Sequence, residues 1–286
     1  MRFVDIKFSQ RSALPGECIS GVVVVQTDKT FECNRVVLKI KGKEHTSMGS
    51  GDSQISDDYY HVKGKIMLSD ATEIPYGKTE FPFKFKLNDG LPPTYSGYYG
   101  YIEYTVQAVV EVDWAVDPTM MRRFRVLPFH PAFIPEVDGY NPLNKETNVM
   151  HVELPSNVLR IKQGIPVRFM VEEHSRVTGV RVEIRRREKA KCRSSRGTHD
   201  TTIVSKFFRL SFHDFHRWKE EVVGKGWQRA PFKSKLHNTV YFLKVVLEMK
   251  WELDPFVQYG LKVSGEKPEE EVKDILDAIA FDLGFN

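Results

Sequence analysis

The chain has 286 residues, enough for two domains of ordinary size, and its 41% hydrophobic content is enough to fill their cores. It has no run of 18 apolar residues and no secretory segment at its start, and its three cysteines are too scattered for a disulfide framework or a zinc site. We therefore expect a soluble cytoplasmic protein. The net charge is +4, but residues 151–236 hold 20 Lys and Arg against 9 Asp and Glu.

Short strands are the main prediction along the whole chain. Residues 21–27 form a continuous apolar run, and alternating apolar residues follow in two later segments. Turn sequences such as LPGE, NDG and YSG separate these runs. Many short strands with regular turns are typical of β-sandwiches. The alternating apolar positions are Val36, Leu38 and Ile40, and Val180, Val182 and Ile184.

One pattern occurs twice. Residues 104–126 and 241–263 are identical at seven of 23 positions and share a period-2 apolar alternation. Each copy contains W-x-x-D-P, at 114–118 and 251–255. Proline ends ladder pairing and Asp before it favours a turn, so both pentapeptides are predicted to be corners between paired strands.

The repeat predicts an all-β protein of two tandem immunoglobulin-like β-sandwiches. We expect an N-terminal sandwich over 1–128, a proline-rich linker over 129–148, a C-terminal sandwich over 149–264 and an amphipathic helix over 265–286.

A family resemblance agrees with this division. LPGECISGVVVV (14–25), KIKGKEHT (39–46), YGKTEFPFKFKL (76–87) and LPPTYSGYYGYIEYTVQAVVEV (91–112), in this order, resemble an arrestin N-terminal domain. FLKVVLEMKWELDPFVQYGLKV (242–263) is similar to the C-terminal domain of the family, although the P-G-E-x-I-x-G pattern is absent over 150–230.

The resemblance implies a non-enzymatic adaptor without a cofactor. Arrestins bind cytoplasmic segments of membrane proteins, acidic lipids and trafficking machinery, and we expect partners of these kinds. A structural vesicle-coat subunit, as in the retromer relative of the family, is the alternative. Two short strings, Pro92–Tyr95 (P-P-x-Y) and Asp254–Phe256 (D-P-F), spell ligands of WW domains and clathrin adaptors, but both fall in predicted turns of the fold.

A basic segment over 181–197 is the candidate binding site for anionic lipid or a phosphorylated peptide. The stretch beyond residue 188 has no apolar period and is predicted to be a long hairpin tip. A solvated cationic loop is the alternative to a binding site. Nucleic acid is a further alternative, which the lack of aromatic residues in the segment disfavours. The candidate residues are Arg181, Arg185, Arg186, Arg187, Lys189, Lys191, Arg193 and Arg196.

The predicted C-terminal helix carries an apolar stripe that packs on its own sandwich or docks in a partner. No catalytic or metal-binding pattern is found; His213 to His216 has no further Cys or His at ligand spacing. The stripe consists of Val272, Ile275, Leu276, Ile279 and Leu283.

Overall fold

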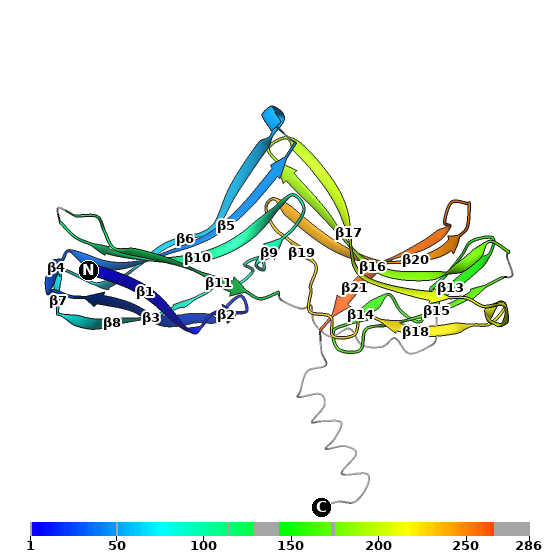
Figure 1. Cartoon of the computed structure of the whole chain (residues 1–286), viewed down its shortest axis with the longest axis horizontal. Coiled ribbons are helices and arrows are strands. Elements are labelled where there is room, and N and C mark those ends of the chain that lie inside the picture. Colours follow the sequence, from blue (N-terminus) through cyan, green and yellow to red (C-terminus); the bar gives the residue numbers. More distant parts are fainter. Residues whose placement is uncertain (1, 50, 114, 129–142, 173–174, 266–286) are drawn as a thin grey trace, which may run out of the picture. The chain divides into compact units, whose positions relative to one another are not determined.

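The computed structural model describes residues 2–49, 51–113, 115–128, 143–172 and 175–265. The predicted C-terminal helix and most of the predicted linker lie outside these residues. The described chain is almost entirely β, with two 3₁₀ turns, η1 (Gly51–Ser53) and η2 (Phe212–Asp214) (Figure 1). The all-β fold class is therefore confirmed.

The chain divides into two compact units. Unit 1 comprises Met1–Phe129 with two later segments, Lys189–Thr198 and Phe232–Asn238. Unit 2 comprises His130–Glu188, His199–Pro231 and Thr239–Asn286.

The first sandwich has two main sheets, ordered β1-β3-β8 and β2-β11-β10-β5-β6, with β9 on β10 and a separate β4-β7 pair. In Figure 1 these two sheets form the two layers of unit 1. The strands are β1 (Arg2–Gln10), β2 (Ser12–Ala13), β3 (Cys18–Thr27), β4 (Phe31–Cys33), β5 (Arg35–Met48), β6 (Ile55–Ser69), β7 (Thr72–Ile74), β8 (Gly77–Lys86), β9 (Tyr95–Ser96), β10 (Gly100–Glu111) and β11 (Thr119–Val126).

The second sandwich has sheets ordered β12-β13-β15-β18 and β14-β21-β20-β16-β17, with β19 on β20. Its first strand lies inside the segment that the sequence predicts to be a linker, so part of that segment is an edge strand. The strands are β12 (Leu143–Glu146), β13 (Met150–Leu154), β14 (Val158–Arg160), β15 (Ile165–Val171), β16 (Val177–Cys192), β17 (Ser195–Arg209), β18 (Lys219–Val223), β19 (Phe232–Lys233), β20 (His237–Met249) and β21 (Phe256–Ser264).

The predicted repeat is reproduced in strand register. Tyr104 pairs with Phe124 in the first copy, and Tyr241 pairs with Leu261 in the second. In each copy a short strand then adds in parallel, β2 to β11 and β14 to β21. The two copies therefore share one topology as well as a sequence pattern.

The two D-P corners are also equivalent. The Asp117 carboxylate accepts a hydrogen bond from the Val112 N–H at 3.0 Å, and Asp254 accepts one from Met249 at 2.9 Å. These contacts close the turns that join β10 to β11 and β20 to β21, so both aspartates are turn residues.

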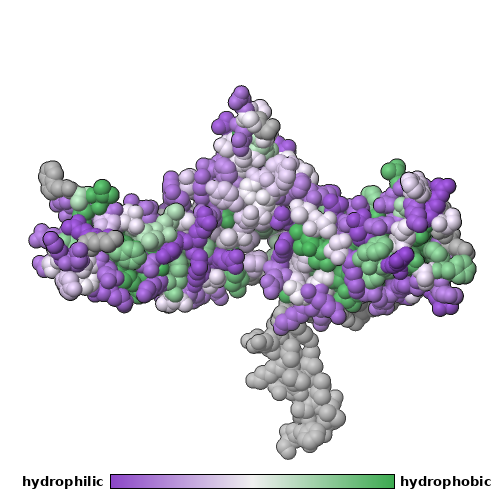
Figure 2. Space-filling model, in the orientation of Figure 1, coloured by the Kyte–Doolittle hydropathy of each residue, from purple (hydrophilic) through white to green (hydrophobic). Residues whose placement is uncertain are grey.

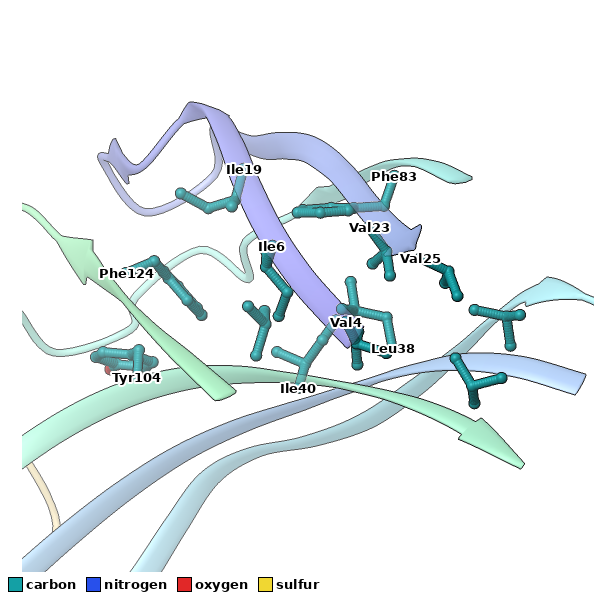
Figure 3. Packing of buried hydrophobic residues seen from close by; sticks show 14 of the residues in the cluster. Val4, Ile6, Ile19, Val23, Val25, Leu38, Ile40, Phe83, Tyr104 and Phe124 are labelled. Atoms are coloured by element: carbon teal, nitrogen blue, oxygen red, sulfur yellow. The ribbon is translucent and has the colours of Figure 1, made fainter. Parts of the chain in front are cut away.

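Each sandwich has its own apolar core. In unit 1 side chains of the two sheets point toward one another, including Ile6 and Phe83 from one sheet and Leu38 and Tyr104 from the other (Figure 3). In unit 2 the buried rings include those of Phe169 and Trp227. The inner face of each long strand is buried, as the alternation predicts: Ile102, Tyr104, Val106, Ala108 and Val110 on β10, and Tyr241, Leu243, Val245 and Leu247 on β20.

Candidate partner-binding surface

The basic segment is mostly regular strand. β16 continues to Cys192 and β17 begins at Ser195, so the predicted long hairpin tip beyond residue 188 is wrong. The strand continues because Glu188, Ala190 and Cys192 are buried on one face. The Cys192 thiol is consequently buried.

The first half of the segment is neutralised by carboxylates. Arg187 makes two hydrogen bonds of 2.8 Å to Asp200, which hold the pKa of that carboxyl below its usual value. Arg181 lies 3.2 Å from Glu183 and 2.9 Å from Glu248. These arginines are therefore already engaged within the fold.

The two remaining arginines of this half are also packed. The Arg185 guanidinium lies 3.9 Å from Glu183 and 5.9 Å from the centroid of the Phe242 ring. Arg186 is half-buried, and it lies on the face of the strand opposite to that of Arg185 and Arg187. The four arginines of residues 181–187 therefore offer little positive charge to an external ligand.

The second half of the segment is exposed and belongs to unit 1. Hydrogen bonds between the backbone of this segment and side chains of β5 and β6 hold it there. The Thr46 hydroxyl donates to the Lys191 carbonyl at 2.9 Å, and the Arg193 N–H donates to the Asp57 carboxylate at 3.0 Å. The Arg193 guanidinium reaches the Ser56 carbonyl at 3.2 Å. The exposed cations are Lys189, Lys191, Arg193 and Arg196.

An open, tyrosine-lined depression of about 660 Å³ lies in unit 1, the unit that also contains these cations. His45, Ser47–Gly49 and Ser96–Tyr101 line it, and Tyr98 is the most exposed of its rings, at 66%. The Tyr99 hydroxyl donates to the Thr198 carbonyl at 3.3 Å and so joins the depression to the end of the basic hairpin. We call the depression and the four exposed cations together the tyrosine–cation surface.

The turn that carries these tyrosines depends on a close backbone approach. A Cβ at Gly100 would lie 1.8 Å from the His45 carbonyl oxygen, so only glycine lets β10 pair with β5 there. The turn is therefore positioned by the sheet itself.

A buried carboxylate, which the sequence prediction missed, fixes a third segment next to this surface. Glu44 on β5 is fully buried. Its Oε1 accepts hydrogen bonds from the Ser234 hydroxyl at 2.5 Å, from the Leu236 and His237 N–H groups at 3.1 and 2.9 Å, and from His237 Nδ1 at 2.8 Å. Its Oε2 lies 2.8 Å from His61 Nε2.

These contacts keep the carboxylate ionised. Burial alone would raise the pKa of Glu44, but hydrogen bonds from His237, His61 and Ser234 outweigh burial and hold the pKa far below its usual value. A buried charge with five donors is stable only while all the donors stay in place, so Glu44 couples β5 to Phe232–Asn238.

The sequence contained a signal for this carboxylate. Period-2 alternation along β5 places position 44 on the same face as Val36, Leu38 and Ile40, where a charge requires partners. Glu188 occupies the corresponding place on β16 in the second copy and is also fully buried.

The other predicted features have structural roles or lie outside the described residues. The carbonyl of Pro92 accepts a hydrogen bond from the buried Tyr104 hydroxyl at 2.7 Å, and Tyr95 packs on His237, so the P-P-x-Y string is part of the fold. Within the described ranges no group of three or more His, Cys, Asp or Glu could hold a metal ion, and no helix is long and apolar enough to cross a membrane. The apolar stripe over 272–283 lies outside the described residues.

Comparison with known proteins identifies the first half of the chain. Residues 4–131 match the family model of the arrestin (or S-antigen) N-terminal domain. These residues are thus similar to an arrestin N-terminal domain. The match covers the first sandwich, and the second sandwich is related to it by the internal repeat described above.

Two curated relatives match at a similar level. Arrestin domain-containing protein 17 of Caenorhabditis elegans is 26% identical over 135 residues, which are 41% of this chain and 32% of the relative. Arrestin domain-containing protein 4 of Mus musculus is 26% identical over 129 residues, which are 39% of this chain and 31% of the relative. The match thus spans about a third of the length of each of these relatives.

Proposed function

We propose that the protein is a non-enzymatic, arrestin-like adaptor that binds cytoplasmic segments of membrane proteins through the tyrosine–cation surface. The observation that carries the proposal is that one unit holds both the four exposed cations and the tyrosine-lined depression, which the Tyr99–Thr198 hydrogen bond joins to the end of the basic hairpin. The arrestin N-terminal domain over 4–131 supports an adaptor rather than an enzyme.

The chemistry of the surface favours an acidic or phosphorylated peptide. Arginine pairs bidentately with phosphate and lysine adds charge without a geometric demand, so the two residue types together suit a flexible phosphorylated segment. Tyrosine rings supply contact area with a small loss of side-chain entropy, which suits recognition of an extended peptide.

A binding experiment on the full chain tests the proposal. One variant changes Lys189, Lys191, Arg193 and Arg196 to Gln, and a control changes Lys7, Lys29, Lys78 and Lys84, four exposed lysines elsewhere in unit 1, to Gln. The probe is an acidic peptide with several phosphoserines, labelled for fluorescence anisotropy, together with its unphosphorylated form.

The expected result is tighter binding of the phosphorylated form to the unchanged protein. The variant should weaken this binding at least about tenfold, since four exposed charge contacts together exceed 1.4 kcal/mol, while the control retains it. Equal binding of both peptide forms, or equal loss in the variant and the control, would refute the proposal.

A further inference from the structure

The outer face of β5 and β6 carries a second group of cations that the sequence does not reveal. Lys39 and Lys41 on β5 alternate with the buried residues Leu38 and Ile40, so they point away from the core. On β6, Lys63 and Lys65 are exposed as well. We call these four residues the lysine face.

Strand register brings these lysines together as like-charged pairs. Lys39 is directly opposite Lys65, and Lys41 is directly opposite Lys63. Directly opposed side chains in an antiparallel pair have Cβ atoms about 4.5–5.5 Å apart, and like charges there destabilise the sheet. Two such pairs in succession concentrate four positive charges on a small area of the sheet.

The acidic groups nearby are engaged with other cations. Asp58 lies 2.9 Å from Lys43 and 2.6 Å from His45, and Glu103 lies 2.5 Å from Arg123. Among the described residues, none of the lysines of the lysine face has a carboxylate partner. The charge of the lysine face is thus left for a ligand outside the chain.

One aromatic ring orders part of this surface. The Lys63 ammonium lies 4.4 Å from the centroid of the Tyr60 ring, and the Lys41 ammonium lies 5.7 Å from it. The ring therefore holds two ammonium groups on the same side of the sheet. In Figure 2 the visible surface over β5 and β6 is mostly hydrophilic.

We propose that the lysine face docks unit 1 on an anionic membrane surface. The face is an open sheet surface of lysines rather than a groove with arginines, and compact ammonium charges suit the diffuse negative charge of lipid headgroups better than the bidentate recognition of one phosphate. This inference extends the proposed function, because an adaptor for membrane-protein segments works next to the membrane that holds them.

Vesicle binding tests the inference on the full chain. Sedimentation is measured with vesicles of phosphatidylcholine alone and with vesicles that also contain phosphatidylserine. The variant changes Lys39, Lys41, Lys63 and Lys65 to Gln, which keeps most of the aliphatic stem, and the control is the Lys7, Lys29, Lys78 and Lys84 variant with the same change in net charge. Melting temperatures verify that both variants fold.

The unchanged protein should bind only the anionic vesicles, and added salt should weaken the binding. Each lysine near an anionic surface contributes about fivefold, so the variant should lose roughly 100-fold or more, and the control should retain most of the affinity. Absence of binding to anionic vesicles, or an equal loss in variant and control, would overturn the proposal.

The peptide assay separates this inference from the proposed function. The lysine-face variant should bind the phosphorylated peptide normally, while the variant at Lys189, Lys191, Arg193 and Arg196 should lose the peptide. If the lysine-face variant instead loses the phosphopeptide and keeps vesicle binding, the lysine face is a peptide site and the membrane proposal is wrong.

Discussion

Replacing Glu44 with Ala should destabilise unit 1 more than a typical point substitution. The carboxylate is fully buried and receives donors from Ser234, Leu236, His237 and His61. Removal leaves these donors without an acceptor in an interior that water does not reach. Charged hydrogen bonds are each worth about 1.5–3 kcal/mol, but five bonds to one carboxylate are not additive.

The free energy of unfolding should therefore fall by about 3–5 kcal/mol, as it does when a buried ion pair is broken. For a unit of this size, such a loss lowers the melting temperature by roughly 6–20 °C. Hydrogen exchange gives a local measurement, because the Leu236 and His237 amides both donate to Glu44 and should lose protection in the variant.

Glu44→Gln is the matched control. The amide oxygen can keep the four contacts of Oε1, and the amide NH₂ can donate to His61 if that ring takes the other tautomer. We expect a loss of about 1–2 kcal/mol, from the weaker hydrogen bonds of a neutral acceptor. A loss below about 1 kcal/mol in Glu44→Ala, with the two amides still protected, would refute the view that this carboxylate holds Phe232–Asn238 on β5.

Acid should remove the same stabilisation. Because the folded pKa of Glu44 is below its unfolded value near 4.5, the stabilisation is complete at neutral pH and is lost as pH falls toward the folded pKa. The stability difference between the unchanged protein and Glu44→Gln should therefore narrow below about pH 4.5. A difference that stays constant down to pH 3 would contradict the assignment.

Three other changes test separate parts of the structure. Gly64→Val should stabilise unit 1 by about 0.5–1 kcal/mol in chemical denaturation, because a Cβ there meets open space beside an apolar cavity of about 210 Å³; destabilisation would show that the cavity cannot be filled. A maleimide should label the half-buried Cys18 before the buried Cys192, and rapid labelling of Cys192 in the folded protein would contradict its burial. Asp200→Asn should cost up to about 1 kcal/mol at pH 7, since the Arg187 pair is partly exposed, and the difference should vanish as pH falls below the usual range of an aspartate; a difference independent of pH would exclude this ion pair as its source.

The tandem sandwiches could be predicted from the sequence because the repeat carries both strand period and turn chemistry. Register is strongly specified where one face is buried, so the shared alternation of β10 and β20 was sufficient to predict equivalent strands. The Asp and Pro of each corner act locally, within a few residues of the strand that they terminate. Local chemistry of this kind can be recognised without knowing the rest of the fold.

The cationic sites could not be predicted in the same way, because unengaged charge depends on distant partners. The segment 181–197 has the highest local density of arginine, yet Arg181 is paired with Glu248 and Arg187 with Asp200. The lysine face arises from two segments about twenty residues apart, and a bulge between Gly42 and Lys43 changes the pairing along the hairpin. No rule based on local density finds it.

Unit 1 includes two segments from much later in the chain, and both begin 60 residues or more after the end of the first sandwich at Phe129. The family match ends at residue 131, yet the compact unit also contains Lys189–Thr198 and Phe232–Asn238. The first of these segments brings the cations of the tyrosine–cation surface, and the second supplies most of the donors to Glu44. A fragment that ends near residue 128 would lose both, and of the five hydrogen bonds to Glu44 only the one with His61 would remain. The carboxylate thus ties the stability of the N-terminal sandwich to residues 232–238, which come from the second half of the chain.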